Sequence, residues 1–307
     1  MNLCSKVAKQ ILLKEASGTY GMKKNSVVSP LSLNALLNLA AAGSTGATEE
    51  VNSWVEKTTK GLIKNIIPEH SLDQDTMIVL ANALYFKGAW NSKFDASMTE
   101  DGDFHLLSGE TVSVPLMTTS YSEYHFYGSF DGVKLVKMPY QKGEGSSQFS
   151  MYIFLPSERN GLQNLIETVE VADGIMLHQL SSHLKEVKLD EFWIPKFKFS
   201  YGLEASNYFK ELGLTKPFQR LGEFKGMSDS VYSEELFVSG VLHKSSVEAN
   251  EEGTVAAAAT TFGFVGCARF PPSKPSFVAD HPFMFVIREE ISGTLLFIGA
   301  VLNPSLH

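Results

Sequence analysis

The chain has 307 residues, of which 44% are hydrophobic and 20% are charged, a composition typical of globular proteins. Its net charge of −8 argues against a nucleic-acid partner, and no window reaches the ~18 apolar residues of a membrane span. The two cysteines, Cys4 and Cys267, are too few for a disulfide framework, although a single bridge stays open. Together these features predict a soluble protein made in a reducing compartment.

The first segments of the chain predict helices. Leu3, Val7 and Ile11 recur at helical spacing without the continuous apolar run of a secretory signal, so we expect a cytoplasmic location in preference to an extracellular one. Residues 26–42 are mostly apolar and predict a second helix, with Pro30 in its first turn. A third, shorter helix is expected around residues 51–67.

Strands dominate the rest of the chain. Residues 76–90 are long, apolar and rich in β-branched and aromatic side chains, which predicts a central strand buried on both faces. Further strands are expected at FHLL, TVSVPLM, VKLVKMPY, FSMYIFLP, 191–201, 238–250 and, as a pair, within 276–304. Helices are expected over 161–184 and 203–213. Without an internal repeat or linker, the pattern predicts one α+β domain spanning residues 1–307.

No catalytic or metal-binding motif stands out. His178 and His183 are five residues apart, a spacing that does not put two metal ligands on one helix face. A Ser/His/Asp triad assembled by folding stays open, but no nucleophile motif singles one out. We interpret His281, which precedes Pro282, as a hydrogen-bonded histidine at the start of a strand and not as a catalytic base. We therefore expect no enzyme, no metal and no cofactor, and we keep a hydrolase only as a third hypothesis.

The stretch EEGTVAAAATTFGFVGCARF, residues 251–270, is small-sided and nearly uncharged. Its alanines favour a helix or a flexible loop, but Gly253 and the later threonines and phenylalanines weaken a helix. The stretch also has a period of two, so alternate residues would share one face of a strand: Thr254, Ala256, Ala258, Thr260, Phe262 and Phe264. The segment can therefore be an exposed loop and also a strand that enters a sheet.

Several stretches resemble the serpin family. EEGTVAAAAT resembles the family's hinge motif, and FVADHPFMFVIREEISGTLLFIGAVLNP resembles its C-terminal signature. SVVSPLSLNALLNLAAAGSTGAT resembles the family's second helix, and ANALYFKGAW resembles the third strand of its central sheet. The chain is similar to the plant branch of the family. The resemblance implies a large central mixed sheet with helices packed on it, a second β-sheet region, and an exposed reactive loop over about 253–276.

The resemblance also implies a function. Serpins are suicide-substrate inhibitors of serine, and sometimes cysteine, endopeptidases: the protease cleaves the reactive loop and is acylated, and the loop then inserts into the central sheet and distorts the protease. The implied partner is therefore such an endopeptidase, held in a covalent complex. We expect a monomer with a hazard of polymerisation, and neither a nucleic-acid nor a membrane partner.

The resemblance assigns three groups of residues. The hinge, which begins the inserting segment, comprises Glu251, Glu252, Gly253, Thr254, Ala256, Ala257, Ala258, Ala259 and Thr260. The shutter, a polar cluster where the sheet opens, comprises Ser29, Ser32, Asn82 and His243. The breach, at the top of the opening, comprises Trp90, Lys196 and Glu251. Plain structural packing is the alternative for each of these residues.

Two features depart from the family. Its spacing puts the reactive bond at Cys267-Ala268, whereas plant relatives commonly have an arginine before this bond, which leaves Arg269-Phe270 as an alternative. A block that includes two strands of the central sheet is missing between Glu50 and Val51, so strand 76–90 would become an exposed hydrophobic edge. Inhibitory competence would then be impaired. The alternative is a non-inhibitory serpin-like protein that is a binding module or a non-functional truncated paralogue.

Overall fold

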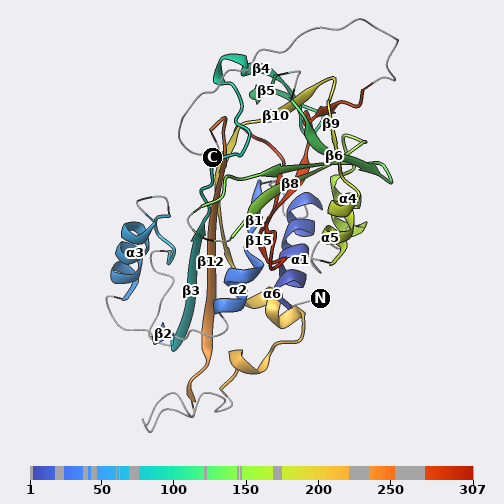
Figure 1. Cartoon of the computed structure of the whole chain (residues 1–307). Helices are drawn as coiled ribbons and strands as arrows, with labels where there is room; N and C mark the ends of the chain where they lie inside the picture. The colour runs from blue at the N-terminus through green and yellow to red at the C-terminus, as the bar shows by residue number, and fades with distance from the viewer. Residues whose placement is uncertain are drawn as a thin grey trace, which may run out of the picture.

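The structure is a computed structural model, and it describes residues 3–17, 24–36, 41–42, 47–59, 61, 63–68, 76–120, 123–143, 145, 147–168, 175–220, 235–252 and 274–306. These residues form three β-sheets with helices packed around them (Figure 1). The α+β fold predicted from the sequence is confirmed. Within the described part of the chain, no helix is long and apolar enough to cross a membrane.

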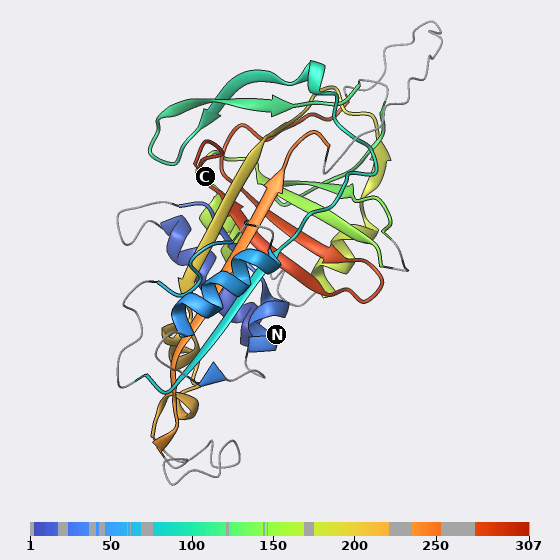
Figure 2. The ribbon, with the colours of Figure 1, turned by 90° about the vertical axis from the view of Figure 1, so that its left-hand side faces the viewer.

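The sheet that carries the candidate site is mixed. Its order is β11 (Phe197–Glu204), β12 (Val238–Ala249), β3 (Ile78–Tyr85) and β2 (Ala41–Ala42). β12 and β3 are parallel, and the other two neighbouring pairs are antiparallel. Figure 2 shows β11, β12 and β3 as long strands that run side by side. β11 alternates buried and exposed residues from Phe197 to Gly202, as expected for a strand with one face on the core.

The other two sheets are antiparallel apart from the β10–β13 pair. The seven-stranded sheet has the order β1 (Ser26–Val28), β15 (Leu295–Val301), β14 (Phe283–Glu289), β8 (Phe149–Pro156), β7 (Val133–Pro139), β6 (His125–Phe130) and β9 (Lys185–Val187). The third sheet has the order β13 (Phe277–Val278), β10 (Phe192–Pro195), β5 (Thr111–Met117) and β4 (Glu100–His105).

The main core lies between the mixed sheet and the seven-stranded sheet. Phe197 of β11 meets Phe285 of β14 with ring centroids 5.6 Å apart, and both rings are buried. α1 (Leu3–Ser17) packs against α2 (Pro30–Leu36), α4 (Leu162–Thr168) and α6 (Ser206–Glu211). The remaining short helices are α5 (Ile175–Ser182), η1 (Ala96–Met98) and η3 (Lys216–Phe218).

A smaller core lies on the other face of the mixed sheet, under α3 (Ala47–Thr58). Val55 of this helix and the three isoleucines that follow it are buried: Ile63, Ile66 and Ile67. They pack against apolar side chains of β3 and β12: Ala81, Ala83, Tyr85 and Leu242. In Figure 2 the helix crosses these strands. Because α3 contains both Glu50 and Val51, the chain passes through the predicted junction as one continuous helix.

Several sequence predictions about the elements need correction. The single strand expected over 191–201 is two strands, β10 and β11, which lie in different sheets, and the helix expected around 51–67 is α3, which ends at Thr58. Residues 26–42 are not one helix: Ser26–Val28 form β1, which pairs with β15, and α2 begins only at Pro30. The residue before a proline avoids the helical region, which explains why the helix cannot start before Pro30. The central strand expected to be buried on both faces, β3, is fully buried only over Ile78–Leu80, and its later residues are partly exposed. Leu203 and Glu204 belong to β11 and not to the following helix.

Candidate functional site

The site is centred on the parallel pair of strands β3 and β12. The two strands are in register from Leu80 opposite Val241 to Tyr85 opposite Ser246, and Asn82 faces His243. β12 leads directly through Asn250 into Glu251 and Glu252, where the predicted hinge begins. The predicted loop therefore starts directly after β12, which is one strand of this parallel pair.

The four residues of the predicted shutter come together across this pair. The Ser32 hydroxyl donates to Oδ1 of Asn82, and the Ser29 backbone N–H donates to Nε2 of His243 over 3.2 Å. Within the turn that starts α2, the Ser32 N–H donates to the Ser29 hydroxyl oxygen over 3.2 Å. The cluster thus ties the first turn of α2 to both β3 and β12.

His243 is held in one protonation state by this arrangement. Nε2 accepts from the backbone of Ser29, so in the neutral ring the proton lies on Nδ1. The side chain is buried, and burial lowers its pKa from 6.5 to about 4. His243 is therefore a neutral acceptor at physiological pH. Protonation of the ring would remove the acceptor that Ser29 requires.

A further buried residue, Ser245, contacts the predicted shutter cluster, and the sequence did not indicate it. Its buried hydroxyl donates to the carbonyl oxygen of Val27 on β1 over 2.6 Å and lies 3.2 Å from Nε2 of His243. Ser245 and His243 are two residues apart on β12, so they share a face of the strand. The two-residue spacing in the sequence indicates that Ser245 lies on the same face as His243. It does not indicate the contact with Val27, because that contact depends on where β1 packs.

The predicted breach also assembles, at the end of β12. The Lys196 ammonium lies 3.0 Å and 2.9 Å from the two carboxylate oxygens of Glu251. The indole N–H of Trp90 donates to the Asn250 carbonyl over 2.8 Å, and the buried indole ring stacks on Tyr140 with centroids 4.4 Å apart. The three breach residues therefore meet where the chain leaves the sheet.

Two residues that the sequence did not indicate complete the environment of Glu251. The Thr99 hydroxyl donates to the Glu251 carboxylate over 2.9 Å, and the backbone N–H of Phe94 donates to the Glu251 carbonyl over 3.0 Å. Burial alone would raise the pKa of Glu251, but the hydrogen bonds from Lys196 and Thr99 hold it below its ordinary value. The first hinge residue is thus an anchored carboxylate.

The outer edge of β3 carries only a short partner. β2 pairs with β3 at two positions, Ala41 opposite Val79 and Ala42 opposite Ile78. Among the described strands, none pairs with the outer edge of β3 from Leu80 to Tyr85. Within the described part of the chain, the mixed sheet is therefore strongly paired on the β11–β12 side and weakly paired beyond β3.

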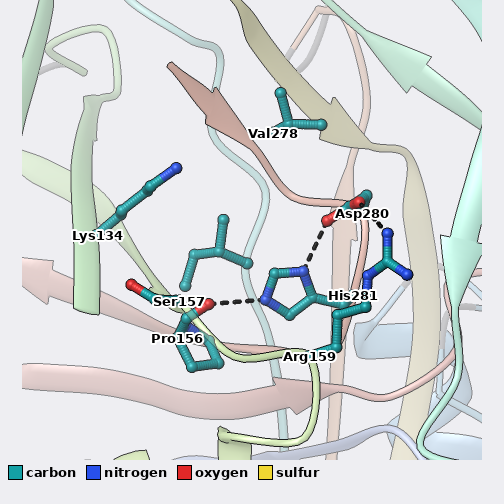
Figure 3. Close-up of a pocket in the computed structure, with 8 residues that line it drawn as sticks. Lys134, Pro156, Ser157, Arg159, Val278, Asp280 and His281 are labelled. Atoms are coloured by element: carbon teal, nitrogen blue, oxygen red, sulfur yellow. Dashed lines mark hydrogen bonds and ion pairs between the residues drawn. The ribbon is translucent and has the colours of Figure 1, made fainter. Parts of the chain in front are cut away.

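His281 has the structural role that the sequence predicted. Its Nε2 lies 2.7 Å from the Pro156 carbonyl oxygen, and its Nδ1 lies 2.6 Å from a carboxylate oxygen of Asp280 (Figure 3). The ring lies just before β14 and ties it to the end of β8. Among the described residues, no group of three or more His, Cys, Asp or Glu side chains is arranged to hold a metal ion.

The remaining predicted residues fall outside the described part of the chain. They are the reactive-bond candidates Cys267, Ala268, Arg269 and Phe270, and the hinge residues Gly253, Thr254, Ala256, Ala257, Ala258, Ala259 and Thr260. The side chain of His178 also lies outside it. Glu252 is described, and its carbonyl accepts the backbone N–H of Trp90 over 3.3 Å.

The sequence is similar to known plant proteins. It is 50% identical over 257 residues to Serpin-ZXA of Oryza sativa subsp. japonica, an alignment that covers 84% of this chain and 63% of the relative. It is 47% identical over 266 residues to Serpin-ZX of Arabidopsis thaliana, covering 84% of this chain and 65% of the relative. The chain thus spans slightly less than two thirds of the length of these relatives.

The fold is also similar to solved structures. The structure of Arabidopsis AtSerpin1 in its native stressed conformation matches with a TM-score of 0.79 and 33% identity, covering 99% of each chain. Uncleaved ovalbumin matches with a TM-score of 0.67 and 26% identity, covering 84% of this chain and 63% of that one. The profile of the serpin (serine protease inhibitor) family matches residues 44–304. With these matches, the chain belongs to the serpin family, among its plant members.

Proposed function

We propose that this chain is a serpin-type inhibitor of serine, or alternatively cysteine, endopeptidases, and that its cleaved loop inserts between β3 and β12. The observation that carries the proposal is the continuity of β12 with the predicted hinge through the anchored Glu251. A strand that entered between β3 and β12 would start at the point where the loop already leaves the sheet.

Insertion requires the β3–β12 ladder to open. The ladder and the shutter bonds of Asn82 and His243 would break, and the new strand would pair on both of its sides. A net gain on the order of ten backbone hydrogen bonds, at ~0.5–1.5 kcal/mol each, is comparable to the whole stability of a domain. The small side chains of Thr254, Ala256 and Ala258 suit such a buried strand, because they need little space between existing neighbours.

We further propose that the chain traps proteases inefficiently. A strand that opens must remain supported by its outer neighbour, and β2 supports β3 at only two positions. When the β3–β12 ladder opens, most of β3 would lose its remaining strand partner. Until the new strand pairs with it, β3 would be held mainly by its two β2 positions, so the open sheet would be poorly supported and the loop would insert too slowly to trap most of the acylated protease.

A second candidate function rests on the same weak edge. A serpin-like protein whose sheet cannot open and close as a unit would be cleaved as an ordinary substrate, and it would act as a binding module or have no function. The short β2 favours this alternative, whereas the assembled shutter and breach favour the inhibitor.

Unfolding temperature before and after loop cleavage separates the two candidates. The protein is nicked once within residues 253–276 and its thermal midpoint is compared with that of the intact chain. Insertion predicts a higher midpoint after cleavage, because the sheet gains a strand. An unchanged or lower midpoint would reject insertion and leave the non-inhibitory alternative.

A further inference from the structure

A polar pocket of about 280 Å³ lies outside the site described above, where β7, the end of β8 and β13 meet (Figure 3). The side chains that give it its chemistry are Lys134, Ser157, Arg159, Asp280 and His281. In liquid water one molecule occupies ≈30 Å³, so this volume admits a small polyatomic ion together with water.

Asp280 supplies the one carboxylate among the described residues that line the pocket, and this carboxylate already interacts with two neighbouring side chains. One of its oxygens lies 2.6 Å from Nδ1 of His281, and the other lies 3.7 Å from a guanidinium nitrogen of Arg159. Burial alone would raise the pKa of Asp280, but the hydrogen bond with His281 and the neighbouring positive groups hold it below its ordinary value. Asp280 is therefore a carboxylate at neutral pH, with its charge balanced inside the pocket.

His281 contributes a buried ring to the wall of the pocket. Nε2 lies 2.7 Å from the carbonyl oxygen of Pro156, and Nδ1 lies 2.6 Å from a carboxylate oxygen of Asp280. The side chain is only 7% exposed, so it fixes the position of the Asp280 carboxylate inside the pocket.

Lys134 adds a charge with no balancing carboxylate. Its ammonium donates to the backbone carbonyl of Ser276 over 3.0 Å, and among the described residues no carboxylate forms an ion pair with it. An ammonium group has three N–H donors, and one neutral acceptor leaves most of that capacity free. Lys134 and Arg159 thus bring two positive charges to the pocket, against the single carboxylate of Asp280 among its lining residues.

We propose that this pocket binds a small oxyanion, a phosphate or a carboxylate, between Lys134 and Arg159. The anion would supply the missing counter-charge, and charge-assisted hydrogen bonds to a lysine and an arginine are the usual means of holding such groups. Since Lys134 also holds Ser276, directly before β13, a bound anion would brace the point where the predicted loop rejoins the fold.

Inorganic phosphate and acetate are the probes for this site, titrated into the full chain at constant ionic strength with chloride as the balancing anion. We expect saturable binding by calorimetry for at least one probe, with affinity roughly tenfold lower in Lys134→Gln and in Arg159→Gln. Comparison of the two probes shows whether the site prefers a phosphate or a carboxylate. Lys185→Gln, an exposed lysine on β9, is the matched control and should bind as the parent does.

Three results would overturn the proposal: no saturable binding of either probe, equal binding by Lys134→Gln and the parent, or an equal loss in the Lys185→Gln control. Arg159 is 63% exposed, so Arg159→Gln should fold even if loss of the Lys134 contact with Ser276 perturbs β13. Circular dichroism of each variant checks the fold before titration.

Discussion

Lys196 and Glu251 form a close ion pair that joins the segment between β10 and β11 to the end of β12. Both carboxylate oxygens of Glu251 lie within 3.0 Å of the ammonium, and the Glu251 side chain is only 12% exposed. The pair therefore holds the first hinge residue beside the strand from which the loop departs. Its loss should loosen this end of the sheet before it affects the shutter.

We expect Lys196→Met to destabilise the chain by about 1–2 kcal/mol, because it leaves the Glu251 carboxylate partly buried with fewer donors. Urea denaturation measures the effect, and Glu251→Gln completes a double-mutant cycle. Lys198→Met is the control, since Lys198 and Glu248 form a more exposed pair that should contribute ~0–1 kcal/mol. Equal effects of the two lysine substitutions would contradict a special role for the Lys196–Glu251 pair.

Stability should fall as the pH is lowered through the range in which unfolded histidine gains a proton. Burial lowers the pKa of His243 from 6.5 to about 4. Above pH 6.5 the ring is neutral in both states. Between pH 6.5 and 4 the unfolded chain binds the proton and the folded chain does not, so unfolding is favoured. Each pKa unit corresponds to ~1.4 kcal/mol, so the loss is on the order of 3 kcal/mol.

Substitution separates His243 from a second histidine. Burial also lowers the pKa of His125 to about 4, so both residues should contribute to the acid loss. Urea midpoints at pH 7.5 and pH 5 should show a smaller difference in His243→Gln than in the parent, and His183→Gln, an exposed control, should match the parent. An unaltered pH dependence in His243→Gln would show that the buried ring does not couple the shutter to pH.

Thr254→Arg should convert an inhibitor into a substrate. The period of two in the hinge places Thr254 on the face that would turn inward on insertion, and a guanidinium cannot be buried there without a partner. Cleavage of the loop should continue while covalent trapping is lost. Val255→Arg, on the opposite face, is the matched control and should retain more trapping. Equal trapping by the parent and Thr254→Arg would rule out insertion of this segment.

The first cleavage should fall at Cys267-Ala268 or at Arg269-Phe270. Exposed loop tips are preferred sites of nicking, and Arg269 offers the side chain that trypsin-like enzymes select. Mass spectrometry after brief exposure to trypsin and to a papain-like protease locates the cut. Fast cleavage between Thr254 and Thr260 would mean that the hinge has been placed wrongly.

The strands were predictable where local pattern and tertiary structure agree. β14 is a mostly apolar segment and β12 carries apolar residues at intervals among polar ones, and both strands form as expected. β1 was not predictable, because Ser26–Val28 read as the start of an apolar helix until their pairing with β15 is known. A three-residue strand depends on its neighbour, which its own sequence does not encode.

The candidate site shows the same division. Family resemblance indicated Asn82, His243 and Lys196, but Ser245 and Thr99 enter through contacts with residues more than 150 positions away, namely Val27 and Glu251. Hydroxyl groups are common in both strands and loops, so their residue type alone does not identify them. Only the packed positions of β1 and η1 bring these partners together.

The most direct test of the proposed function is the fraction of chain that traps a protease. The purified protein is incubated with a slight excess of a trypsin-like or a papain-like protease, and the covalent complex is quantified against cleaved chain by denaturing electrophoresis. Our account predicts a covalent complex that survives denaturation but remains the minor product, because β2 supports only two positions of β3. Complete cleavage without any complex would contradict inhibition, and a near one-to-one complex would contradict the importance that we assign to the weakly paired edge of β3.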